Sequence, residues 1–130
     1  MNKPWAQPPP PIVSGSPVHA SISPTALARL ACAMEMWIGE GARQVDLPWV
    51  APAPFVAATR PSDCSAEDVS TPHGQLLASG EQAFCWLASK GLLEEQGPFV
   101  GWTPCFRDEA HFDAIHHYGF MKVEAFAWAD

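Results

Sequence analysis

The chain has 130 residues, with 7 basic and 14 acidic side chains, which gives a formal net charge of −7. This length suits one domain with its own core, and the 48% content of hydrophobic residues argues against wholesale disorder. The acidic balance argues against non-specific binding to DNA or RNA, which needs clustered lysine and arginine. No apolar run is long enough to span a bilayer, and the N-terminus lacks the apolar stretch of a signal peptide. We therefore expect no membrane association and a cytoplasmic location.

The first 22 residues are rich in proline. They hold six of the 14 prolines, including the run 8–11, which favours a short polyproline II stretch because each ring fixes φ and removes a hydrogen-bond donor. We interpret 1–22 as a flexible arm and 23–130 as the folded unit. The alternative for the arm is a ligand for a proline-recognition module.

The first regular element that the sequence predicts is a helix over 24–38. Ser23 is a suitable N-cap, and Pro24 suits the first helical position, where its missing N–H has no cost. Gly39 and Gly41 are expected to end the helix. Apolar residues recur at spacings of three and four and so predict one packed face: Leu27, Leu30, Ala31, Met34, Trp37 and Ile38.

Shorter elements follow, and together they indicate an α+β domain with an antiparallel sheet flanked by helices. We predict a strand over 45–50 broken by Pro48, an irregular connection over 51–72, a strand over 76–78, a helix over 82–90 with Gly91 as its cap, strands over 99–106 and 120–128, and a loop over 111–119 between these last two. Two strands joined by such a loop form an antiparallel hairpin.

The four cysteines contain no C-x-x-C pair. Cys32 and Cys85 lie in apolar helical segments, where a cysteine usually behaves as a small buried hydrophobe. We therefore expect free thiols, with a disulfide or a metal site as the alternatives. His111, His116 and His117 fall in the predicted loop without a fixed ligand spacing, so we interpret them as loop residues and predict no metal site.

The order of elements and two motifs resemble the catalytic core of class II aminoacyl-tRNA synthetases, and most closely the seryl enzymes. The first motif of that family is a long helix, a glycine and a strand with a signature proline. The segment at about 24–50 is similar to this motif, with Pro48 in the place of the signature proline. The second motif is a strand with Phe-Arg-x-Glu and a returning strand with a phenylalanine and a glutamate. It is similar to about 99–126, which contains Thr-Pro-Cys-Phe-Arg-Asp-Glu at 103–109.

The resemblance implies roles for six residues in binding ATP, an amino acid and Mg²⁺. Arg107 matches the catalytic arginine that holds the ATP α-phosphate, a task suited to its fork of donors. Glu109 and Phe120 match the residues that bind the adenine amino group and stack on the adenine ring. The acids expected on the amino-acid side, where a carboxylate pair would also assist a magnesium-bound phosphate, are Glu81 and Glu124, with Ser79 in the family's Thr-x-Glu position.

The residues themselves leave simpler readings open. Arg107 and Glu109 lie two apart on a strand and would form an ion pair on one face, since residues i and i+2 project together. Phe120 could pack in an ordinary core, and Glu124 could be a solvated strand residue.

The sequence departs from the family pattern in lacking the third motif, a glycine-rich strand and helix with a second arginine, and in having no anticodon-binding domain. We therefore expect weak binding of ATP or an aminoacyl-adenylate-like ligand without charging of tRNA; any activity would be amino-acid activation. The alternatives are a non-catalytic paralogue that acts by association and a fragment-like product without activity. Because the first motif forms the dimer interface in the family, we expect a homodimer with the 24–38 helix and the strand that ends at Pro48 at or beside the interface.

Overall fold

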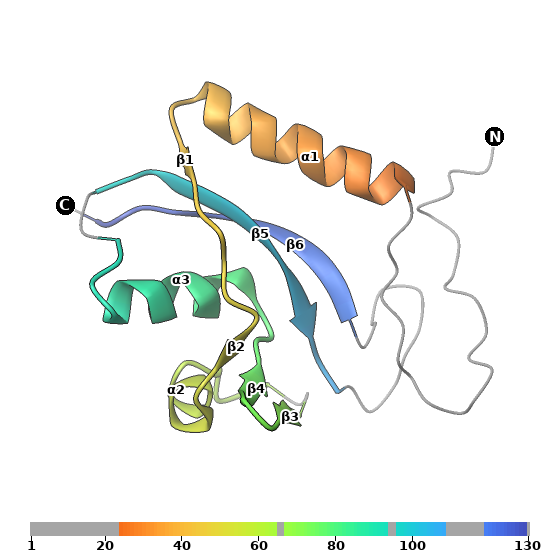
Figure 1. Cartoon of the computed structure of the whole chain (residues 1–130), viewed down its shortest axis with the longest axis vertical. Helices are drawn as coiled ribbons and strands as arrows, with labels where there is room; N and C mark the ends of the chain where they lie inside the picture. The colour runs from red at the N-terminus through yellow and green to blue at the C-terminus, as the bar shows by residue number, and fades with distance from the viewer. Residues whose placement is uncertain (1–23, 65–66, 94–95, 109–118, 130) are drawn as a thin grey trace.

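The computed structural model describes residues 24–64, 67–93, 96–108 and 119–129 (Figure 1). In chain order the elements are α1 (Pro24–Gly39), β1 (Arg43–Gln44), β2 (Val50–Ala51), α2 (Ala53–Ala58), β3 (Val69–Thr71), β4 (Gly74–Leu76), α3 (Gly80–Ser89), β5 (Phe99–Phe106) and β6 (Gly119–Phe126). The prediction of an α+β domain with an antiparallel hairpin and flanking helices is confirmed. The N-cap predicted at Ser23, the arm at 1–22, and the loop with its three histidines lie outside the described residues.

The main sheet has the order β1-β5-β6. β5 and β6 pair antiparallel over their whole length, from Phe99 opposite Phe126 to Phe106 opposite Gly119. β1 adds a short parallel edge to β5, which Val45 N–H extends by donating to Val100 O at 2.9 Å. Figure 1 shows α1 on one face of this sheet and α3 on the other.

The predicted strand over 45–50 is wrong as a single element. Its segment instead joins β1 to β2, which belong to different sheets, and Figure 1 shows the chain crossing between them. Pro48, which has no N–H to donate, lies in the crossing. β2 pairs with β4, and β4 with β3, in a small antiparallel sheet below α3.

The predicted irregular connection over 51–72 contains α2 and β3. Pro52 and Pro54 do not prevent the helix, because they lie at the start of α2, where a proline has no N–H to lose and has a suitable φ. β3 and β4 form a hairpin through a turn at 72–73, and Gly74, the first residue of β4, has a φ of +134°. A Cβ at Gly74 would lie 2.7 Å from Ala51 O, so the close approach of β2 requires glycine at this position.

The core lies mainly between the sheet and α3. Phe84, Leu77 and Val56 are fully buried there, and the ring of Phe126 stacks on Phe84 at 5.4 Å between centroids. A smaller cluster under α1 contains the buried residues Met34, Ala42 and Val100. The prediction of one packed face on α1 is therefore wrong in part, because three of the residues predicted to pack are exposed: Ala31, Trp37 and Ile38. Their neighbours Cys32 and Met36 are exposed as well.

Cys32 is exposed rather than buried, and Cys85 is half-buried. None of the four cysteines forms a disulfide bond, as the sequence predicts. Among the described residues, no helix is both long and apolar enough to cross a membrane.

Candidate functional site

The sequence-predicted residues Ser79, Glu81 and Arg107 line one open cleft of about 500 Å³, a size typical of small-molecule sites. Its walls come from the start of α3, the connection over 59–68, the end of β5 and the middle of β6. Four carboxylates and three cations line it: Asp63, Glu67, Asp68, Glu81, Arg60, Arg107 and Lys122.

Arg107 follows directly after β5 and is half-buried. Its Nε donates to Ala78 O at 3.1 Å, and its guanidinium carbon lies 5.1 Å from the centroid of the Phe120 ring. A cation over an aromatic face is attracted by the ring quadrupole. Phe106 N–H donates to Leu77 O at 2.9 Å, so two adjacent hydrogen bonds hold the end of β5 against the segment entering α3.

The start of α3 is positioned by its cap. Ser79 Oγ accepts from Gln82 N–H at 3.3 Å, which satisfies one of the free N–H groups of the first turn. The buried Gln82 side chain accepts from Ala78 N–H at 3.0 Å and donates to Thr59 Oγ1 at 3.1 Å. The helix therefore begins at Gly80 rather than at the predicted residue 82, because the Ser-x-x-Gln pair caps it two residues earlier.

The two acids assigned to the amino-acid side are in different environments. Glu81 is exposed in the first turn of α3, where a negative charge is favoured by the helix dipole. Glu124 packs against Gly80 instead: a Cβ on Gly80 would lie 2.8 Å from Glu124 Cβ. Its buried Oε2 lies 2.8 Å from Lys122 Nζ, although no residue of the described part of the chain gives it a well-oriented hydrogen bond.

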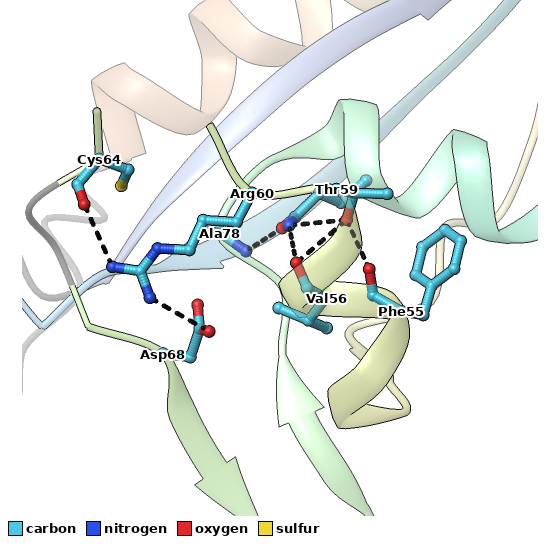
Figure 2. Close-up of polar contacts among 8 residues, drawn as sticks. Phe55, Val56, Thr59, Arg60, Cys64, Asp68 and Ala78 are labelled. Atoms are coloured by element: carbon cyan, nitrogen blue, oxygen red, sulfur yellow. Dashed lines mark hydrogen bonds and ion pairs between the residues drawn. The ribbon is translucent and has the colours of Figure 1, made fainter. Parts of the chain in front are cut away.

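The outer wall is the connection after α2. Arg60 donates to Asp68 Oδ2 at 3.3 Å and to Cys64 O at 3.4 Å, both long contacts, as Figure 2 shows. Glu67 and Asp108 form an isolated antiparallel bridge, with Glu67 N–H donating to Asp108 O at 2.9 Å. This bridge ties the wall to the residue that follows Arg107.

Cys105 lies on β5, two residues before Arg107, and is fully buried. Burial raises the pKa of its thiol to about 11, and Glu124 also raises it, while Lys122, Arg107 and a hydrogen bond from Gly80 N–H act in the opposite direction. The thiol is therefore protonated at neutral pH and is not a nucleophile there. Burial, and then the charge of Glu81, raise the pKa of Cys85.

The structure thus places Ser79, Glu81 and Arg107 on the cleft. Phe120 lies against Arg107, so one face of the ring assigned to adenine carries a guanidinium. Glu124 contacts the cleft through Lys122. Glu109 lies outside the described residues, and with it the Arg107–Glu109 ion pair. In the part of the chain that the structure describes, no group of three or more His, Cys, Asp or Glu could hold a metal ion.

Sequence reasoning missed most of the polar residues that line the cleft, among them Lys122, Gln82 and Arg60. Lys122 could have been found, because it shares a strand face with Phe120 and Glu124. Gln82 could have been found from the Ser-x-x-Gln spacing that marks a helix start. Arg60 gave no signal, since it follows a short helix that was not predicted and precedes Pro61 in a segment without periodicity.

Comparison with solved structures finds a cytoplasmic serine-tRNA ligase from Naegleria fowleri in complex with AMP. The likeness has a TM-score of 0.59 over 76% of this chain, at 17% sequence identity. It shows the fold. The match covers 26% of the synthetase, so this chain spans about a quarter of that enzyme. No protein-family profile matches the sequence, and no curated protein matches it.

Proposed function

We propose that this chain is a class II aminoacyl-tRNA synthetase-like protein that binds ATP or an aminoacyl-adenylate-like ligand weakly in the cleft, without charging tRNA. The observation that carries the proposal is the position of Arg107 and Glu81 on one cleft, from the end of β5 and the first turn of α3. A guanidinium suits a phosphate, and a carboxylate suits an ammonium group. The Naegleria fowleri enzyme was solved with AMP, which supports a nucleotide as the ligand class.

The charged residues of the cleft would bind different parts of the ligand. Arg107 and Lys122 supply positive charge for phosphate oxygens, and Arg107 would also stabilise charge that develops if an adenylate forms. Mg²⁺ would enter with the ATP phosphates, and Glu81 is the carboxylate of the proposed pair that faces the cleft. Stacking of adenine on the face of Phe120 now covered by Arg107 would require the guanidinium to move.

Calorimetric titration of ATP and of AMP into the parent protein and Arg107→Ala tests this proposal. We expect weak binding by the parent and a loss of about ten- to a hundredfold in the variant, the usual effect of removing a charge-assisted contact. Because Arg107 also bonds Ala78, the variant should be less stable, so titrations should be run well below its melting temperature.

Lys90→Ala is a matched control. Lys90 Nζ lies 4.4 Å from the Trp86 ring centroid and does not line the cleft, so this variant also loses one positive charge and one cation–π contact. We expect it to bind nucleotide like the parent. No binding by the parent at millimolar ATP would refute the proposal, and robust charging of tRNA would refute its second part.

The second candidate function is that of a non-catalytic paralogue that acts by self-association. It is favoured by the outer face of α1, where Met36, Trp37 and Ile38 are 73%, 44% and 43% exposed. Exposed apolar side chains gathered on one helix are typical of an interface. In this alternative α1 of one copy packs on a second copy.

A further inference from the structure

Within the described residues, the backbone groups on the outer edge of β6 pair with no other strand. β6 is the last strand of the sheet. Val100 O accepts from Val45 N–H and therefore faces β1. Because backbone groups alternate in direction along a strand, the even-numbered residues of β5 direct their N–H and C=O groups away from β6. The antiparallel register, in which Gly101 lies opposite Glu124, then directs the N–H and C=O groups of Met121, Val123 and Ala125 outward.

This edge lacks three of the usual devices that prevent pairing, which are a short strand, a proline and a bulge. β6 is eight residues long and carries no proline, and its pairing with β5 is continuous without a bulge. The opposite edge of the same sheet is different, because β5 has Pro104 on its outward side beyond the end of β1. The chain therefore blocks one open edge and leaves the other able to accept an extended strand.

The side chains of β6 are complementary to a second, antiparallel copy of β6. A two-fold axis at Val123 places Val123 opposite itself and Met121 opposite Ala125, and each of these pairs exchanges two hydrogen bonds. The same axis places Lys122 opposite Glu124 of the other copy, twice by symmetry. Phe120 then lies opposite Phe126. Opposite charges and aromatic pairs stabilise adjacent strands.

Other registers lose this complementarity. An axis at Met121 places Lys122 opposite Phe120, and an axis at Ala125 places Glu124 opposite Phe126. Axes at Lys122 or Glu124 also keep the faces of the two strands aligned, but they place Lys122 or Glu124 opposite itself, and like charges directly opposite each other are destabilising. Compared with the axes at Met121 and Ala125, the axis at Val123 also pairs a longer stretch of the strand.

We propose that β6 is a self-association surface, on which two copies join their sheets edge to edge about a two-fold axis at Val123. The side chains at the contact are half-buried in the single chain. The even-numbered residues face α3, as Phe126 and Glu124 do, and Val123 on the other face packs in the cluster under α1. This surface is distinct from the exposed face of α1, and it shares Lys122 with the lining of the cleft.

Light scattering during size-exclusion chromatography, at high micromolar concentration, tests the proposal with Ala125→Pro. Proline at 125 removes an outward N–H and no bond to β5, so the variant should fold, as circular dichroism checks. We expect the mass to fall to half that of the parent. A parent that is monomeric at this concentration, or a folded variant with the parent's mass, would overturn the proposal.

A charge exchange tests the register itself. Lys122→Glu places two acids opposite each other at both symmetric positions and should weaken association about tenfold or more, as Glu124→Lys should with two bases. The double variant restores opposite charges and should recover dimerisation. Failure of the double variant to recover, with its fold intact, would refute the axis at Val123.

Amide exchange followed by NMR provides a readout that does not depend on a variant. The amides of Met121, Val123 and Ala125 should be protected in the concentrated parent and should exchange faster on dilution. The amides of Lys122 and Glu124, which face β5, should remain protected at both concentrations and serve as the internal control. Protection of the odd-numbered amides that is independent of concentration would contradict pairing between copies.

Discussion

Replacing Gly80 with alanine should destabilise the protein, although alanine is normally the better helix residue. The ideal Cβ at this position would lie 2.8 Å from Glu124 Cβ and 3.3 Å from Glu124 Oε2. A distance below 3 Å between two such carbons forces the start of α3 or β6 to move. The movement would also disturb the contact between the start of α3 and β6, which holds Glu124 in place.

The magnitude follows from two opposing effects. Overpacking of a close contact costs about 1–3 kcal/mol. The gain in helix propensity is at most about 1 kcal/mol, and less at the first position of a helix. We therefore expect a net loss of about 1–2 kcal/mol in the free energy of unfolding, which lowers the Tm by roughly 4–10 °C in a domain of this size. Thermal and urea unfolding followed by circular dichroism measure both quantities.

Gly39→Ala is the matched control, because Gly39 is the last residue of α1 and nothing lies within 4 Å of its ideal Cβ. We expect it to unfold like the parent or slightly later. A double-mutant cycle with Glu124→Gly, which removes the opposing Cβ, should show that the two changes together cost less than the sum of each alone. A Gly80→Ala protein as stable as the parent, or an additive cycle, would refute the packing argument.

Two further predictions concern the buried thiol of Cys105 and the exposed face of α1 at Met36. Because the pKa of Cys105 is raised from 9.0 to about 11, the unfolded chain loses this proton at lower pH than the folded chain, so the free energy of unfolding should decrease between about pH 9 and 11 by up to about 2.7 kcal/mol. Denaturant unfolding of the parent and Cys105→Ala over this range should show the steeper decrease in the parent; equal slopes would contradict the burial effect. Met36→Glu places a charge on the exposed face of α1 and should lower the solution mass if that face associates; an unchanged mass would exclude α1 as an interface.

Local patterns in the sequence determined the elements that depend on near neighbours. The helix over 24–38 was predicted from a three- and four-residue repeat, and the strand over 99–106 from its own composition, because both signals lie within the element. Gly91 was predicted as a helix end because a left-handed φ, here +70°, favours glycine. Arg107 and Glu81 were proposed as site residues from a resemblance in motif order.

Only the tertiary structure decided how distant segments meet. The strand predicted over 45–50 became a crossing between two sheets, since pairing partners far along the chain, not local propensity, determine where a strand lies. Glu124 was assigned to the ligand, but its position is determined by contact with Gly80, 44 residues earlier. Arg60 lines the cleft because it follows α2, a helix that the sequence did not reveal. The packed face of α1 is narrower than predicted, with Met34 as its buried residue in the cluster with Ala42 and Val100. Contacts over such separations depend on the assembled fold, so no window of neighbouring residues contains them.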